Sequence, residues 1–246
     1  MYQTNVPERV NALSEKSPES AVAKFMESIR KGRSFLIFHV IPNGPTKHKS
    51  KTQFGNIIQI GYRLLNTKLQ TIEEKCVCIY THPYVLSELT SQQTGITNEK
   101  MEIQGVSFLE AFVDLSEVLI SNNAILMSFG VASLRYLEAA MELCHASFPN
   151  GSRWKRDWID IELITGSVLE PELSLEQALR HMGIKPAGMF QDASAAVENS
   201  SALLSAIFGN WLHDYEQRTS SMPWPLLPEP PKATWFQRNF ENIIQH

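Results

Sequence analysis

Cysteine is scarce in this sequence: Cys76, Cys78 and Cys144 are the three thiols in 246 residues. Three cysteines cannot all pair with one another, which argues against a disulfide framework. We expect free thiols, because an intracellular setting keeps cysteines reduced. A zinc site that joins His145 to the three cysteines can be drawn, but its spacing matches no common zinc module, and buried thiols are the simpler interpretation.

Long apolar runs and an excess of positive charge are also missing. No apolar run approaches the roughly 18 residues of a membrane span, and the first 19 residues are polar, without the charged-then-apolar order of a signal peptide. We therefore expect a cytoplasmic protein with no membrane contact. The net charge of -4 argues against a protein that coats nucleic acid by bulk electrostatics, so any nucleic-acid contact must be local.

The chain does have enough apolar residues, 43% of the total, for one sizeable core. Helical spacing of apolar residues over 21–29, after the cap Ser17-Pro18-Glu19, predicts an added N-terminal helix. Short apolar runs then predict three strands, which suggests an antiparallel meander; they lie at residues 35–41, 57–62 and 76–80.

The second half of the chain alternates between helical and strand patterns. The sequence predicts the order strand, strand, strand, helix, strand, helix, strand, helix, helix, which is typical of an α/β domain with a mixed sheet flanked by helices. The elements expected here are helices at 107–119, 134–143, 175–182 and 195–208, and strands at 124–127 and 158–163.

Three parts of the chain differ in composition. We predict an N-terminal arm and helix at 1–33, the α/β domain at 34–210, and a C-terminal tail at 211–246 that is rich in proline and aromatic residues. An aromatic tail needs a surface to cover, either its own domain or a partner. Its candidate partner-binding residues are Trp224, Trp235, Phe236 and Phe240.

Motifs spread from residue 34 to residue 208 resemble those of the DEDDh (DnaQ-like) 3′-5′ exonucleases. Residues 38–44 match the frame of the family's Phe-Asp-x-Glu-Thr-Thr-Gly strand, and residues 94–97 read Thr-Gly-Ile-Thr within its Leu-Thr-Gly-Ile-Thr segment. Residues 128–137 resemble the second motif, in the Trp-Gly-x-x-Asp form of RNA-directed members. Residues 183–191 and Asn199 resemble the third motif. The resemblance implies an RNase H-like α/β fold.

The acids of that family are absent at the matched positions. The resemblance implies that four carboxylates hold two divalent ions and that a histidine acts as general base. Hard cations need oxygen ligands, which these side chains do not supply. We therefore expect no metal, no cofactor and no catalysis by this mechanism; the degenerate motif positions are His39, Ile41, Ser133, Gln191 and Ala196.

A divergent metal-dependent exonuclease, acting on RNA or single-stranded DNA, is the alternative. It would use acidic residues that have moved from the family positions. Asp160 and Glu162 would share one face of the strand predicted at 158–163, although a polar strand face is the simpler interpretation. The acids near the matched positions are Asp157, Asp160, Glu162, Asp192 and Glu198.

Two basic clusters could contact nucleic acid in the absence of catalysis. One combines cations with an aromatic ring, which suits backbone contact together with base stacking. We expect a non-catalytic binding or scaffolding subunit, with a protein partner or a second copy of the chain, and with RNA or single-stranded DNA as a further partner. The nucleic-acid-binding candidates are Lys47, Lys49 and Lys51 in the first cluster, and Arg153, Trp154, Lys155 and Arg156 in the second.

Overall fold

The structure is a computed structural model of the whole chain, and it describes residues 17–43, 57–80, 86, 88–149, 151 and 153–219, with the side chains of the last helix described as far as residue 209. The first basic cluster and the aromatic residues of the C-terminal tail are not in this part of the chain. The residues that lie outside the described part are Lys47, Lys49, Lys51, Trp224, Trp235, Phe236 and Phe240.

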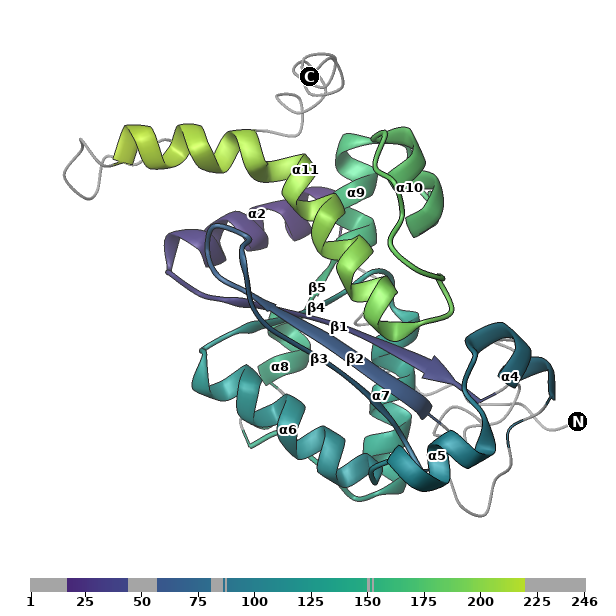
Figure 1. The fold of residues 1–246 in the computed structure, drawn as a ribbon. Coiled ribbons are helices and arrows are strands. Elements are labelled where there is room, and N and C mark those ends of the chain that lie inside the picture. Colours follow the sequence, from purple (N-terminus) through teal and green to yellow (C-terminus); the bar gives the residue numbers. More distant parts are fainter. Residues whose placement is uncertain are drawn as a thin grey trace, which may run out of the picture.

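A five-stranded mixed sheet forms the centre of the molecule, in the order β3-β2-β1-β4-β5 (Figure 1). Strands β1 (Phe35–Pro42), β2 (Ile57–Leu65) and β3 (Thr71–Cys78) form an antiparallel meander. Strands β4 (Ile125–Ser128) and β5 (Ile159–Asp160) run parallel to β1. The predicted meander and the predicted mixed α/β sheet are both confirmed.

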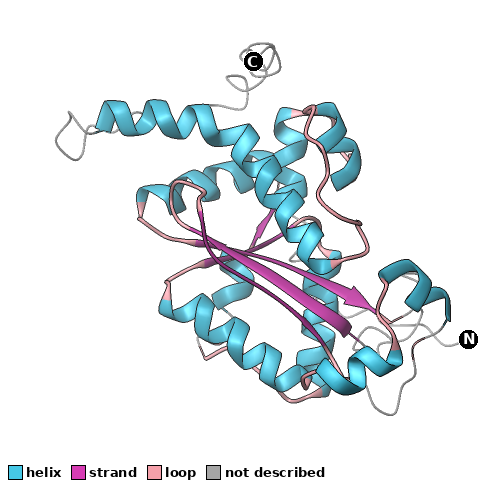
Figure 2. Ribbon diagram, in the orientation of Figure 1, coloured by secondary structure: helices cyan, strands magenta, loops and turns pink. Residues whose placement is uncertain are grey.

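Strand β1 is buried on both faces because helices cover the sheet from two sides (Figure 2). Successive side chains of a strand point to opposite faces. Phe35 and Ile37 accordingly belong to one apolar cluster, whereas Leu36 and Phe38 belong to another. The near-continuous apolar run that predicted this strand follows from its double burial.

The first face carries helices α2 (Pro18–Arg30), α9 (Ile161–Val168), α10 (Leu175–His181) and α11 (Ala193–Thr219). Helix α2 begins as the sequence predicts, because the Ser17 side chain accepts a hydrogen bond from the Ser20 backbone N–H. Its Phe25 ring is fully buried between the rings of Phe35 and Phe208, with centroids 4.7 and 4.5 Å away. The N-terminal helix is therefore packed into the core.

The second face carries α6 (Phe108–Ser121), α7 (Ala132–Leu143) and the short α8 (Arg153–Asp157). Two further short helices, α4 (Glu88–Thr94) and α5 (Asn98–Gln104), lie beyond the end of the meander (Figure 1). Among the described residues, the structure contains no helix with the length and apolar character that a membrane crossing requires.

One sequence prediction about local structure is wrong. The strand predicted at 158–163 ends at Asp160, where the carboxylate accepts a hydrogen bond from the Glu162 N–H at 2.9 Å and caps helix α9. Glu162 therefore lies on a helix and does not share a strand face with Asp160. The basic run from residue 153 forms α8. The tail boundary placed after residue 210 falls within α11.

Candidate functional site

The first and second motif positions meet at the end of β1. The Ser133 hydroxyl, near the start of α7, lies 3.1 Å from the Nδ1 atom of His39, 94 residues away in sequence. The same hydroxyl accepts a hydrogen bond from the Val40 backbone N–H at 3.4 Å. The Ser133 hydroxyl therefore joins the backbone of β1 to the His39 ring through two hydrogen bonds.

Burial lowers the pKa of His39 to about 4. The imidazole is therefore neutral at pH 7. His39 and Ser133 thus form a neutral, hydrogen-bonded pair.

The N-terminus of α11 is fixed against the sheet beside this pair. Gly61 lies opposite His39 in β2, and a Cβ atom there would meet the backbone carbonyl group of Ala193 at 2.8 Å. The Gln59 side-chain oxygen accepts a hydrogen bond from the Ala193 N–H at 2.8 Å. Only glycine at position 61 leaves room for the start of α11 to approach the sheet so closely.

The remaining motif positions divide between core and surface. Ala196 is 2% exposed in the first turn of α11, and Ile41 is buried in one apolar cluster with Ala193. Gln191 is exposed in the turn before α11. The structure therefore brings His39 to Ser133 and buries Ile41 and Ala196, while Gln191 faces outward.

Asn199, the motif residue that this chain retains, has a structural contact. Its side-chain oxygen accepts a hydrogen bond from the Ala187 N–H at 2.8 Å, and its amide nitrogen donates to the Ala187 carbonyl oxygen at 3.0 Å. The pair of bonds holds the loop before Gln191 against α11. Since Asn199 is 1% exposed, both of its polar atoms need these partners.

The alternative acidic residues are engaged in contacts of their own. Asp160 is buried, accepts N–H bonds from Gly130 and Glu162, and its pKa is raised to about 6 by burial. Asp192 accepts a hydrogen bond from the Ser194 N–H, and the exposed carboxylate of Glu198 lies 3.8 Å from Arg63. No three His, Cys, Asp or Glu side chains gather closely enough to hold a metal ion within the described part of the chain.

No protein-family model and no curated protein matches the sequence. Solved structures do match the fold. One shows 3′-end-specific recognition of a histone mRNA stem-loop by a 3′-exonuclease, with a TM-score of 0.63, 15% identity, and coverage of 81% of this chain and 83% of that one. The nuclease domain of 3′hExo, a DEDDh family member bound to rAMP, gives a TM-score of 0.58 and 17% identity over 74% and 93% of the chains.

Cell-death related nuclease 4 (CRN-4) gives a TM-score of 0.61 and 15% identity over 73% of this chain and 64% of that one. The chain has the fold of the DEDDh 3′-exonucleases. This confirms the fold that the motifs implied.

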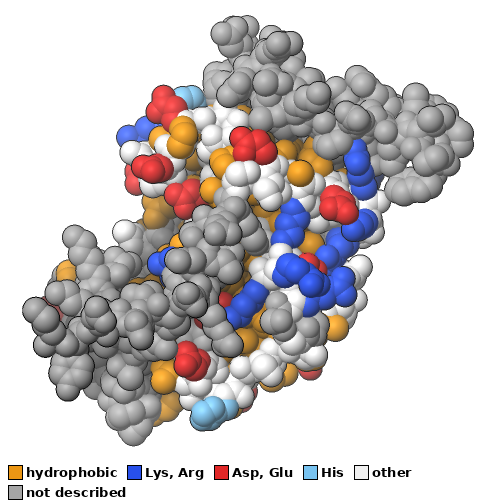
Figure 3. Space-filling view, turned by 180° about the vertical axis from the view of Figure 1, so that it is seen from behind, with side chains coloured by type: hydrophobic (Ala, Val, Ile, Leu, Met, Phe, Trp, Pro, Cys, Tyr) orange, Lys and Arg blue, Asp and Glu red, His pale blue; other side chains and the backbone are white. Residues whose placement is uncertain are grey.

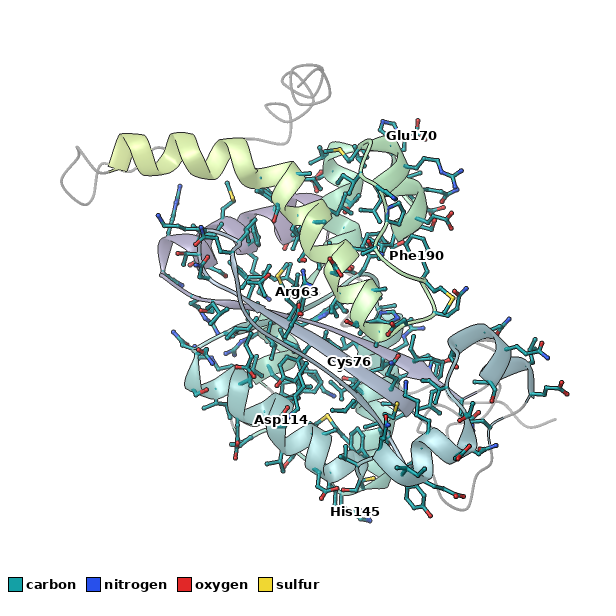
Figure 4. The ribbon with its side chains drawn as sticks, in the orientation of Figure 1. Arg63, Cys76, Asp114, His145, Glu170 and Phe190 are labelled. Carbon is teal, nitrogen blue, oxygen red and sulfur yellow. The ribbon has the colours of Figure 1, made fainter. Side chains whose placement is uncertain are left out.

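Beside the motif positions, this exonuclease fold has a pocket of about 340 Å³ that the sequence did not reveal. Its lining includes Gln59, Asp192 and the thiols Cys76 and Cys78. Burial raises the pKa of Cys76 to about 11, so this thiol is protonated at neutral pH. His145, the fourth member of the zinc alternative, lies far from Cys76 at the edge of the molecule (Figure 4).

In the second basic cluster, Trp154 is buried and not available for the base stacking that the sequence suggested. Trp154 is 4% exposed, and its ring packs against Phe148 with centroids 4.8 Å apart. The prediction that Trp154 stacks on nucleobases is therefore wrong, because helix α8 turns this ring into the core. Lys155 lies over that ring, 5.5 Å from its centroid, while Arg153 and Arg156 are exposed.

Proposed function

We propose that this protein is a non-catalytic member of the exonuclease fold, which acts as a binding or scaffolding subunit in a cytoplasmic protein or nucleoprotein complex. The observation that carries the proposal is the neutral His39–Ser133 pair at positions where the family needs carboxylates. Two-metal catalysis requires anionic oxygen ligands to hold both ions. A neutral imidazole bonded to a hydroxyl does not supply them.

Three further features support the loss of catalysis. Ile41 and Ala196 are buried apolar side chains, which cannot coordinate a cation. Asp160, the most deeply buried of the alternative acids, caps a helix. Gln191 has no basic nitrogen with which to activate a water molecule.

A nucleic acid is the first partner to test. The solved structures that share this fold include a 3′-exonuclease with a histone mRNA stem-loop and exonuclease I of E. coli with a dT13 oligonucleotide. A fold that supports nucleic-acid binding can retain a binding surface after it loses its metal ligands.

The test is a nuclease assay on the full chain. Labelled single-stranded RNA and DNA are incubated with Mg²⁺ or Mn²⁺, and we expect no 3′ trimming beyond an EDTA control. Trimming that EDTA abolishes, and that a matched His39→Ala/Asp160→Asn preparation lacks, would overturn the proposal in favour of the divergent metal-dependent exonuclease. Trimming of equal rate in both preparations identifies a contaminating nuclease, and its removal should leave no activity.

A further inference from the structure

Cations from two distant parts of the chain form one surface at the N-terminal end of the parallel strands. Seen from behind, Lys and Arg side chains gather along the side of the molecule where α2 and α8 lie (Figure 3). We call this the α2–α8 surface. Its residues are Lys24, Lys31, Arg33, Arg153, Lys155 and Arg156.

Direct contacts join the two halves of this surface. The Lys24 ammonium group donates hydrogen bonds to the carbonyl oxygens of Arg156 and Trp158, more than 130 residues away. Arg33 lies 3.3 Å from the Asp157 carboxylate at the end of α8. The added N-terminal helix is therefore fixed beside α8, so its cations and those of α8 form one continuous charged area.

The acids around α8 lie deeper than its cations, whereas Glu27, which pairs with Lys31 on α2, is about as exposed as that lysine. Asp157, 20% exposed, has three arginines within 4 Å: Arg33, Arg153 and Arg156. Burial would raise the pKa of Asp157, but the bonds and charges of Arg33 and Arg153 outweigh it and lower the pKa. The side chains of Arg153 and Arg156 are 63% and 77% exposed, so positive charge faces the solvent.

Lys155 of α8 also pairs with a carboxylate that is less exposed than the lysine itself. Its ammonium nitrogen lies 2.7 Å from a Glu138 carboxylate oxygen of α7, and the exposed fractions of the two side chains are 45% and 23%. Here too the cation is outermost. Around α8, the carboxylates therefore orient the cations without covering them.

We propose that the α2–α8 surface binds the phosphate backbone of nucleic acid, away from the former metal positions. Arg33 and Asp157 directly precede β1 and β5, whereas His39 and Asp160 lie toward the C-terminal ends of these parallel strands. The two regions therefore occupy opposite ends of the sheet. The proposed surface is therefore separate from the motif positions.

The chemistry of the surface favours phosphates over an acidic protein. Guanidinium groups bind phosphate and carboxylate oxygens alike through paired N–H donors, so the distinction rests on the apolar contacts that a protein partner needs. Protein partners usually need apolar anchors, but none of the exposed large apolar side chains of the described residues lies in α2 or α8. With Trp154 and Trp158 buried, stacking on bases is not available, so we expect binding without base preference.

The test is a binding titration in EDTA, which separates binding from cleavage. Labelled mixed-sequence RNA and DNA are titrated with the full chain at several salt concentrations. Replacing Arg153 and Arg156 by glutamine should lower the affinity about ten-fold at low salt and reduce the slope of log K against log salt by about 1.5. Arg153→Lys/Arg156→Lys should keep the slope, because the charges remain.

A matched control removes two exposed cations elsewhere. Arg180→Gln/Lys185→Gln, at and after the end of α10, makes the same change in net charge and should leave the affinity within about two-fold. Equal losses in both double variants, no binding by the unmodified chain, or competition by polyglutamate as strong as by RNA would each overturn the inference. Thermal unfolding of each variant, expected to show at most a small decrease because each set of changes also removes a largely exposed ion pair, ensures that a lost affinity reports the surface.

The inference rests on the proposed function only in treating binding as separate from cleavage. Trimming in Mg²⁺ would overturn the proposed function and leave the binding titration to be judged on its own. Equal nucleic-acid affinities of the two double glutamine variants would overturn the inference that the α2–α8 surface binds phosphates. The result of the nuclease assay would not be affected.

Discussion

The two ends of the central sheet satisfy their polar groups in different ways. At the C-terminal end of β1, His39 and Ser133 form a neutral hydrogen-bonded pair. At the N-terminal end, Asp157 forms ion pairs with Arg33 and Arg153. The fold thus determines where chain segments meet, while the side chains decide which end carries charge. We call the end with the neutral His39–Ser133 pair the neutral end, after that pair, and the end with the Asp157 ion pairs the charged end.

The largest expected effect comes from returning a carboxylate to the neutral end. Ala196→Asp would bury an acid in the first turn of α11 without a cationic partner, and we expect it to lower the free energy of unfolding by about 3 kcal/mol. Ala23→Asp, on an exposed face of α2, is the matched control and should cost about 0.7 kcal/mol at most. Denaturant unfolding measures both.

The same variant, Ala196→Asp, also tests whether the neutral end can bind a metal ion. If Mg²⁺ or Mn²⁺ restores the stability that Ala196→Asp loses, the neighbouring acids hold a metal ion after all, and the neutral end is a latent metal site. We expect the unfolding midpoint of this variant to be the same in EDTA and in either cation.

A middle-sized effect is expected at the charged end. Asp157→Asn removes the anion that Arg33 and Arg153 share, and since Arg33 is 17% exposed, the loss should be about 1–2 kcal/mol. Glu176→Gln, which removes the exposed partner of Arg180, should cost no more than about 0.5 kcal/mol. Urea unfolding at low and high salt distinguishes them, because only the Asp157 effect should be large, and it should shrink in salt. Equal, salt-independent losses would contradict an ionic role for Asp157.

The effect that is smallest at neutral pH is a pH dependence from His39, which develops only as the pH falls. Its pKa falls from 6.5 to about 4 on folding, so between these values the unfolded chain binds the proton that the folded protein excludes. Stability from this group is therefore complete above pH 6.5 and decreases as the pH falls toward 4, by about 1–2 kcal/mol after allowance for its partial exposure. His39→Gln should remove this decrease.

Asp160 makes the control for that measurement necessary. Its pKa is raised to about 6, so its contribution runs the other way: it is present at low pH and is lost as the pH rises from about 4 to 6. The quantity to measure is therefore the difference in unfolding free energy between the original chain and His39→Gln at each pH. A constant difference from pH 4 to 7 would show that His39 does not titrate differently in the two states.

Local patterns predicted most of the sheet and failed where a side chain or a helix changed the outcome. The apolar run of β1 and the Ser17 cap of α2 need only neighbouring residues, and both were predicted correctly. The alternation around Asp160 suggested a longer strand, but the Asp160 carboxylate caps a helix there. Trp154 lies among cations in sequence, and only the turn of α8 directs its ring inward.

The sequence by itself determined that carboxylates are missing from the matched motif positions, because residue identity is covalent and needs no fold. Only the tertiary structure decided that two of the side chains at these positions meet. The hydrogen bond between His39 and Ser133 depends on packing α7 against the end of β1. The tertiary structure also decided that Lys24 of α2 lies beside Arg156 of α8. Proximity between residues more than 130 positions apart arises from packing, which local sequence patterns do not encode.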